Sequence, residues 1–240
     1  MTTVQDLQRR LIALGFPLPK YGPDGGMGVE TLAAMNGAID ALVASRAGAE
    51  ASETPLAPFV PAAKPRPAGI VPPDWMPAAK MERIICHWTA GAHKATEFDR
   101  QHYHILIEAD GKLVRGIPSI KLNEHPLAKG YAAHTLSCNS GSIGVSLCCM
   151  AGANEAPFVA GNAPMTKEQW DTLTTVVAEL CHRYGIPITG RTVLSHAEVQ
   201  PTLGIQQRGK WDYTRLTFDP SKVGAIPCGN KLRREALAKL

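Results

Sequence analysis

Arg83-Ile-Ile-Cys-His-Trp-Thr-Ala-Gly91 is the stretch of this 240-residue chain that most constrains its architecture. The apolar, β-branched run from Arg83 to His87 predicts a buried strand, and the small residues that follow indicate where the strand ends. His87 then stands at the open end of that strand, with an imidazole able to bind a metal ion. A second strand that ends on a histidine, Arg191–His196, is predicted far downstream.

Two downstream segments offer further ligands to a metal at His87. His196 lies in Thr192-Val-Leu-Ser-His-Ala-Glu-Val199, and Asp212 closes Arg208-Gly-Lys-Trp-Asp212. Two imidazoles and one carboxylate leave the fourth position of a tetrahedral zinc open, as a catalytic zinc site requires. Hydrogen-bonded core histidines are the alternative interpretation. Glu198 is a rival ligand, or an acceptor for an imidazole N–H.

The other histidines have plainer interpretations. His102 and His104 lie two apart on a predicted strand, so they face the same side and form an alternative pair of ligands. His93, His125 and His182 stand in polar or helical surroundings, where we expect solvated side chains.

Composition limits the classes of partner. Hydrophobic residues make up 45% of the chain, which suffices for one well-packed α/β domain and a smaller unit. The net charge of +4 arises without a block of lysine or arginine, so nucleic acid is not indicated. A polyanionic cell wall or a membrane surface fits this charge equally well. No apolar run is long enough to span a bilayer, so we expect no membrane insertion, and we expect a monomer.

The cysteines and the N-terminal residues indicate where the protein is made. The six cysteines show no CxxC pair and no zinc-finger spacing, so we expect reduced core residues, with a disulfide as the alternative. The polar stretch Met1–Asp6 leads straight into a helix and does not resemble a signal peptide. Both features predict synthesis in a cytoplasm.

Four segments are predicted along the chain. Residues 1–44 form a small helical unit, and residues 45–73 form an Ala/Pro-rich linker. Residues 74–222 form the main domain, and residues 223–240 form a helical tail.

The small unit is expected to contain two amphipathic helices. Thr3 caps the first of them, whose apolar stripe is Val4, Leu7, Leu11 and Leu14. The second begins near Val29, and its apolar stripe is Leu32, Met35, Ile39 and Leu42. Two helices alone bury little apolar surface, so a third short helix or a contact with the main domain is expected.

The main domain alternates strands with helices. A hairpin with an Asp110-Gly111 turn is predicted over His102–Glu108 and Lys112–Arg115, and a further strand over Ser142–Cys149. Thr166 and Gln169 form a capping box, which opens a long helix that stops at Gly185. This pattern predicts an α/β fold in which helices flank a mixed central β-sheet.

Residues 80–220 carry a series of short motifs in a distinctive order. They are His87-Trp-Thr-Ala-Gly91, Tyr103-His-Ile-Leu-Ile107 with Asp110-Gly111, Tyr131-Ala-Ala-His134, Asn139-Ser-Gly-Ser-Ile-Gly-Val145, Ser195-His-Ala-Glu198 and Lys210-Trp-Asp212. This order and spacing resembles the type-2 N-acetylmuramoyl-L-alanine amidases, a zinc enzyme family that includes phage amidase-lysozymes and peptidoglycan recognition proteins. The resemblance implies zinc-dependent hydrolysis of the amide between N-acetylmuramic acid and L-alanine in peptidoglycan.

The resemblance also implies roles for individual residues. It places the zinc ligands at His87, His196 and Asp212. It assigns Lys210 to stabilising the oxyanion, and it assigns substrate contact to His134, Trp88 and Thr89.

Two features depart from the family pattern. Some members carry a catalytic glutamate on the strand that corresponds to Ser142–Cys149, where this chain has Ser146. The phage lysozymes carry a tyrosine at the place of Tyr103 instead, so we favour Tyr103 as the group that handles the proton or orients water. A tyrosine that fills the sheet face is the alternative. The segment Ala197–Trp211 is longer than in most members, so it must fold back to bring Asp212 to the metal.

The N-terminal unit resembles peptidoglycan-binding helical domains through Val4-Gln-Asp-Leu-Gln-Arg-Arg-Leu-Ile-Ala-Leu-Gly15 and Pro23-Asp-Gly-Gly-Met-Gly28. A wall-binding unit joined to an amidase suggests a phage or prophage lysis enzyme, made in the bacterial cytoplasm and acting on the cell wall. A host remodelling amidase and a non-catalytic peptidoglycan receptor are alternatives. A cysteine hydrolase that uses Cys86 or Cys138 is a further one.

Overall fold

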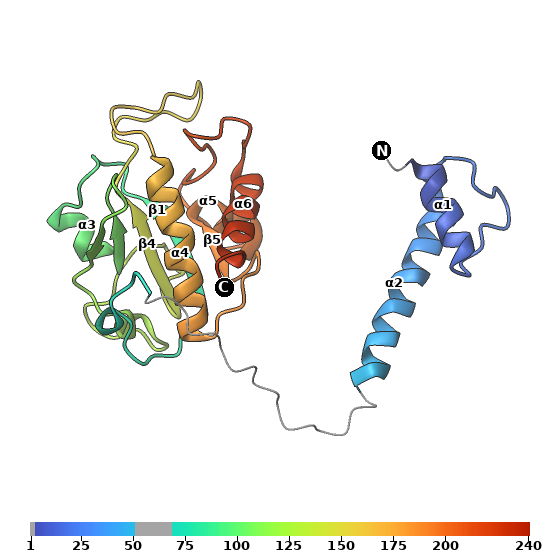
Figure 1. The fold of residues 1–240 in the computed structure, drawn as a ribbon, viewed down its shortest axis with the longest axis horizontal. Coiled ribbons are helices and arrows are strands. Elements are labelled where there is room, and N and C mark those ends of the chain that lie inside the picture. Colours follow the sequence, from blue (N-terminus) through green and yellow to red (C-terminus); the bar gives the residue numbers. More distant parts are fainter. Residues whose placement is uncertain (1–2, 51–68) are drawn as a thin grey trace. The chain divides into compact units, whose positions relative to one another are not determined.

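The structure, a computed structural model, describes residues 3–50 and 69–240 (Figure 1). The chain divides into two compact units, Met1–Pro65 and Arg66–Leu240. Most of the predicted linker, residues 51–68, lies outside the described residues. Within the described ranges, no helix has both the length and the apolar character needed to cross a membrane.

The N-terminal unit contains two helices in residues 3–50, α1 (Val4–Ala13) and α2 (Val29–Glu50). Thr3 caps α1 in a capping box with Asp6, as the sequence predicts. The helix α2 runs to Glu50, six residues into the range predicted as linker, because that part is rich in alanine, the best helix former.

The inward face of α2 differs from the predicted stripe. Leu32 and Ile39 are exposed, whereas Thr31 and Ala34 are buried. Small residues face α1 because Gln8, a buried polar side chain, occupies the space between the helices. Its amide donates to Thr31 Oγ1, Asp24 Oδ1 and the Gly26 carbonyl, each at 2.9 Å. The loop between the helices is thus organised by a hydrogen-bond network rather than by a third helix.

The C-terminal unit is built on a five-stranded sheet with the order β3-β2-β4-β1-β5. The strands are β1 (Arg83–Trp88), β2 (Ile105–Ile107), β3 (Leu113–Arg115), β4 (Ser142–Leu147) and β5 (Val193–Ser195). All neighbours pair in parallel except β2 and β3, which form the predicted antiparallel hairpin. This arrangement confirms the predicted mixed sheet.

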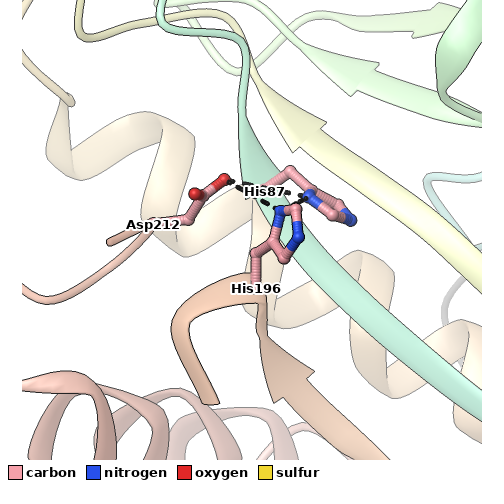
Figure 2. Close-up of side chains that lie close together, drawn as sticks. All are labelled: His87, His196 and Asp212. Atoms are coloured by element: carbon pink, nitrogen blue, oxygen red, sulfur yellow. Dashed lines mark hydrogen bonds and ion pairs between the residues drawn. The ribbon is translucent and has the colours of Figure 1, made fainter. Parts of the chain in front are cut away.

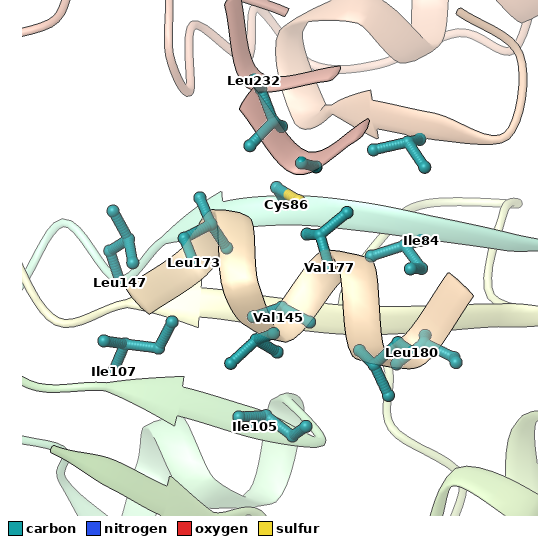
Figure 3. Packing of buried hydrophobic residues seen from close by; sticks show 14 of the residues in the cluster. Ile84, Cys86, Ile105, Ile107, Val145, Leu147, Leu173, Val177, Leu180 and Leu232 are labelled. Atoms are coloured by element: carbon teal, nitrogen blue, oxygen red, sulfur yellow. The ribbon is translucent and has the colours of Figure 1, made fainter. Parts of the chain in front are cut away.

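Side-chain alternation along β1 places its core residues on one face of the sheet and His87 on the other, because successive side chains of a strand point to opposite faces. Ile84, Cys86 and Trp88 face a large hydrophobic cluster, in which Leu173 and Leu232 also lie (Figure 3). The residues in between, Ile85 and His87, face the other side of the sheet. That second face holds a smaller cluster of Ile85, Cys138 and Val199, and it leaves His87 among polar neighbours.

Two long helices cover the core face, α4 (Lys167–Tyr184) and α6 (Ala225–Leu237) (Figure 1). Thr166 and Gln169 form the predicted capping box of α4, and Gly185 ends the helix in the left-handed conformation. The six cysteines all lie in described segments, and each is buried and free, as predicted.

Short helices account for the main differences from the prediction. The helix α3 (Glu97–His102) includes His102, which therefore lies outside β2 and does not pair with His104. The helix α5 (His196–Leu203) begins at His196, directly after β5. Two single-turn 3-10 segments, Pro73–Trp75 and Ile120–Asn123, complete the unit.

A buried ion pair fixes α5 against α6. Arg233 Nη2 donates to Glu198 Oε1 at 2.9 Å, and Arg233 Nη1 donates to Glu198 Oε2 at 3.2 Å. Glu198 also accepts from the Ser195 backbone N–H at 2.8 Å and is fully buried. Glycine at 229 permits this approach, since a Cβ there would lie 2.1 Å from the carboxylate. The pair thus holds the turn from which His196 projects.

We expect Arg233→Ala to lower the free energy of unfolding by about 3–5 kcal/mol, because it leaves the Glu198 carboxylate buried without its partner. Equilibrium denaturation in urea measures this. Arg234→Ala is the matched control, because Arg234 is the next residue along the chain and its side chain is exposed. We expect it to change the free energy of unfolding by no more than about 0.5 kcal/mol. Equal effects of the two substitutions would contradict the assigned role of the pair.

Candidate metal centre and active site

Three side chains that are distant in sequence converge at the end of β1: His87, His196 and Asp212 (Figure 2). The two imidazole Nδ1 atoms are 3.0 Å apart, and Asp212 Oδ2 lies 3.8 Å from each of them. One ligand atom from each residue falls within 4.8 Å of the others. The long segment between His196 and Asp212 folds back, which brings Asp212 to the two histidines.

Backbone contacts fix two members of this cluster. The Trp88 N–H donates to Asp212 Oδ2 at 3.3 Å, so the residue after His87 orients the carboxylate. The Tyr213 hydroxyl donates to the His87 carbonyl at 2.6 Å, which ties the segment after Asp212 to the end of β1. Strand β1 and the chain around Asp212 are thereby locked together.

The second ring nitrogen of His87 faces a polar wall. His87 Nε2 lies 3.2 Å from His134 Nδ1 and 3.3 Å from Thr135 Oγ1. His134 Nε2 lies 3.4 Å from the Ser142 carbonyl, which can only accept, so a proton on His134 Nε2 leaves Nδ1 to accept hydrogen bonds from His87 Nε2 and from the Thr135 hydroxyl, 2.8 Å away. Gly144 makes room for this packing, since a Cβ there would lie 2.6 Å from the His134 ring.

These contacts fit a bound cation. Gln207 Oε1 faces His196 Nε2 at 3.0 Å, so the outer nitrogens of His87 and His196 both have an acceptor. With protons on the two Nε2 atoms, both Nδ1 atoms present lone pairs to each other across 3.0 Å, beside a carboxylate. A positive ion among the three atoms relieves that repulsion. Nitrogen and oxygen donors of this kind suit zinc.

Burial sets the protonation of the cluster. It lowers the pKa of His87, and it lowers the pKa of His196 to about 4, with the neighbouring imidazole acting in the same direction. Burial opposes ionisation of Asp212, but the two imidazoles beside it hold its pKa below the ordinary value. At neutral pH the cluster therefore offers two neutral imidazoles and one carboxylate, which are the forms that bind metals.

Tyr103 stands beside the cluster. Its ring centroid is 5.2 Å from that of His87, and burial raises the pKa of its phenol, with the Asp212 charge adding to the effect. Tyr103 therefore keeps its proton at neutral pH and is an O–H donor. The adjacent Ser146 hydroxyl is fully buried, and within the described chain it has no hydrogen-bond partner.

A groove leads away from the His87–His196–Asp212 cluster. One wall is the loop from Tyr131 to Ser140, which includes His134, and the other is formed by His196, Gln207, Arg208 and Lys210. The structure thus places the predicted groove residue His134 and the predicted cation Lys210 on either side of the same opening. No acidic residue occurs among the described residues that line it.

Some sequence-predicted candidates lie elsewhere. Trp88 is 5% exposed and packs edge-on against Trp211 and Tyr213 in the core, so its side chain does not reach the groove. Thr89 follows it out of the strand, and its hydroxyl accepts from the Gly91 N–H at 3.1 Å. Glu198 pairs with Arg233 and is not a ligand candidate.

The alternative histidine and cysteine sites also lie apart from the cluster. His104 is buried, and it contacts Asn123 Oδ1 at 3.0 Å and the Gly144 N–H at 2.9 Å. Cys86 and Cys138 are buried, and burial raises the pKa of each thiol, which disfavours the thiolate that a nucleophile requires.

Sequence reasoning missed two residues that contact the cluster, namely Thr135 and Gln207. Thr135 follows the recognised His134 directly, which was a usable signal. Gln207 stands in an irregular loop with no motif around it, so only the structure identifies it.

Comparison with known proteins places this geometry in a family. The model of the N-acetylmuramoyl-L-alanine amidase family, Amidase_2, matches residues 77–213, a range that contains His87, His196 and Asp212. No curated protein matches the chain significantly.

The chain is also similar to several solved structures. AmiD from E. coli, solved with anhydro-N-acetylmuramic acid-L-Ala-D-gamma-Glu-L-Lys, is 20% identical, with a TM-score of 0.37 over 50% of this chain and 50% of that one. LysC from Clostridium intestinale is 17% identical, with a TM-score of 0.36 over 59% of this chain and 82% of that one. The Ph2119 endolysin of a Thermus scotoductus bacteriophage is 18% identical, with a TM-score of 0.35 over 53% and 78%.

The present chain thus spans half the length of AmiD. Because the family model matches more than half of the chain, including every residue of the His87–His196–Asp212 cluster, the chain belongs to the N-acetylmuramoyl-L-alanine amidase family, Amidase_2.

Proposed function

We propose that the protein hydrolyses the amide between N-acetylmuramic acid and L-alanine in peptidoglycan, with zinc held by His87, His196 and Asp212. The observation that carries this proposal is the convergence of these three buried side chains at the end of a groove. The site offers three protein ligands, as catalytic zinc sites do, and leaves room for water and a carbonyl.

Bound zinc supplies Lewis acidity, which activates water and polarises the scissile carbonyl. The protein's own groups do the rest. Lys210 is exposed on the groove wall next to His196, and its charge already lowers the pKa of both histidines. The ammonium therefore acts on the same space as the cluster, where it would stabilise negative charge on the carbonyl oxygen in the transition state.

Tyr103 has the role of a hydrogen-bond donor. Burial keeps its phenol protonated, so it orients a lone pair of the attacking water or the carbonyl rather than removing a proton. His134 stays neutral, because burial and the nearby imidazoles lower its pKa well below the ordinary value. It therefore steadies His87 and borders the substrate without adding charge.

The charge of the groove supports a stem peptide as the bound group. Arg208 and Lys210 are both exposed along it, and the residues described there include no carboxylate. The stem peptide of peptidoglycan carries carboxylates, whereas the glycan strand offers mainly neutral hydroxyl and amide groups. The substrate that fits is therefore a muramoyl peptide with its acidic stem along the cationic wall.

We further propose that the N-terminal unit holds the enzyme on its polymeric substrate, and that the protein acts as a monomeric phage or prophage lysis enzyme. The pairing of a helical unit that resembles wall-binding domains with an amidase unit supports this. Tethering two binding units raises the local concentration of substrate without any new contact at the active site.

Digestion of purified cell wall is expected to release new N-terminal L-alanine without new reducing sugar ends. A chelator should abolish the release, and zinc should restore it. His87→Ala should lower the rate more than about 100-fold, since even outer-shell partners of a metal cost 10–100-fold. New reducing ends would indicate a glycosidase, and undiminished activity after complete zinc removal would exclude the proposed metal site.

Lys210→Met is expected to lower kcat by about 10²–10³-fold while zinc affinity stays unchanged, because it removes an oxyanion partner and no ligand. Tyr103→Phe should also lower kcat at unchanged zinc affinity, since only the hydroxyl is lost. Lys112→Met is the control, because Lys112 is an exposed lysine in the β2–β3 hairpin. Full activity of the Lys210 and Tyr103 variants would contradict their assigned roles.

Removal of residues 1–65 is expected to reduce co-sedimentation with cell wall while leaving hydrolysis of a small soluble muramoyl peptide unchanged. The two readouts separate attachment from catalysis. Unchanged wall binding by the shortened chain would contradict a wall-binding role for the N-terminal unit.

A further inference from the structure

Gln207 is a buried polar side chain at the edge of the metal-binding cluster. It is 9% exposed and lies in the loop that follows α5. Its backbone N–H donates to Gln200 Oε1 at 2.8 Å, which anchors the loop to the helix that His196 begins. The side chain is thereby directed back at His196 from within the same local unit.

The orientation of the Gln207 amide follows from its partners. Gln207 Nε2 lies 2.9 Å from the Leu136 carbonyl and 3.4 Å from the Ile205 carbonyl. Carbonyl oxygens only accept, so the NH₂ group must face them and the amide oxygen must face His196. That oxygen lies 3.0 Å from His196 Nε2, which makes Nε2 the protonated nitrogen and leaves the Nδ1 lone pair directed into the cluster.

The same amide joins the two walls of the site. Leu136 belongs to the loop that also carries His134 and Thr135, and those two side chains contact His87 Nε2. A single loop therefore touches both imidazoles, one through its own side chains and the other through Gln207. Loss of the Gln207 amide frees the His196 ring to rotate or to take the other tautomer.

We propose that Gln207 is a positioning residue, which fixes the tautomer and ring orientation of His196 for metal binding and couples that ring to the groove wall at Leu136. This inference rests on the proposed role of His196 as a zinc ligand. Outer-shell partners of this kind change metal affinity by about 10–100-fold when they are removed.

Zinc affinity of the full-length protein tests the inference, measured by competition with a chromophoric chelator at fixed pH. Gln207→Leu and Gln207→Ala should weaken zinc binding by about 10–100-fold, because neither side chain can accept from His196. Gln207→Glu keeps an acceptor oxygen for His196 Nε2 but loses the NH₂ that faces the Leu136 carbonyl, so we expect it to weaken zinc binding clearly less than the Leu variant does. Gln206→Ala is the matched control, because Gln206 precedes Gln207 directly and its side chain is exposed.

Thermal unfolding of the zinc-free variants shows whether they remain folded. If the Leu variant does not fold, the Glu variant still allows the test. Parent-like zinc affinity of a folded Leu variant would overturn the inference. Equal weakening of the Leu and Glu variants would also overturn it, because packing rather than the accepted hydrogen bond would then control affinity. If His196→Ala leaves zinc affinity unchanged, the proposed function itself fails, which is a distinct result.

Discussion

Two imidazole nitrogens that face each other across 3.0 Å inside the protein, with a carboxylate beside them, are the constraint around which this unit is organised. Burial disfavours protonating either ring, so repulsion between their lone pairs is not removed by a proton at neutral pH. A cation removes it, and the outer nitrogens already have acceptors. The two facing lone pairs beside a carboxylate therefore indicate a cation site more strongly than the proximity of three such residues alone does.

The fold supplies this constraint through strand alternation and parallel pairing. Strand β1 lies between β4 and β5, so its apolar residues fill the core face while His87 faces the other side. Strand β5 runs parallel to β1, which brings the start of α5 to the same edge of the sheet. The buried Glu198–Arg233 pair then ties that turn to α6. The His87–His196–Asp212 cluster thus depends on a helix that contributes none of its three residues.

Particular residues show how far sequence reasoning reached. The run Arg83–His87 and the Thr166–Gln169 capping box were sufficient for β1 and for the start of α4, because periodicity and capping are local signals. The helix α3 was missed because six residues give too few turns for a helical period, and so His102 was assigned to a strand. The family resemblance supplied the ligand set, and the structure brings those side chains together.

One further error could have been avoided from the sequence, and two contacts could not have been predicted from it. Strand alternation places Trp88 on the face opposite His87, so the assignment of Trp88 to the substrate conflicted with the side-chain alternation of the predicted strand. The sequence could not predict the ion pair of Glu198, because its partner Arg233 lies 35 positions downstream in a helix with no motif. The contact between Gln207 and His196 could not be predicted either, because it depends on the path of an irregular loop that returns to the His196 ring.

X-ray absorption at the zinc edge of the zinc-loaded protein identifies the atoms that bind the ion. We expect one zinc per chain, bound by two imidazole nitrogens and a carboxylate oxygen, with the remaining position taken by a light atom from solvent. Sulfur scattering from one of the buried cysteines, or zinc bound in less than stoichiometric amount with no imidazole signature, would contradict this expectation.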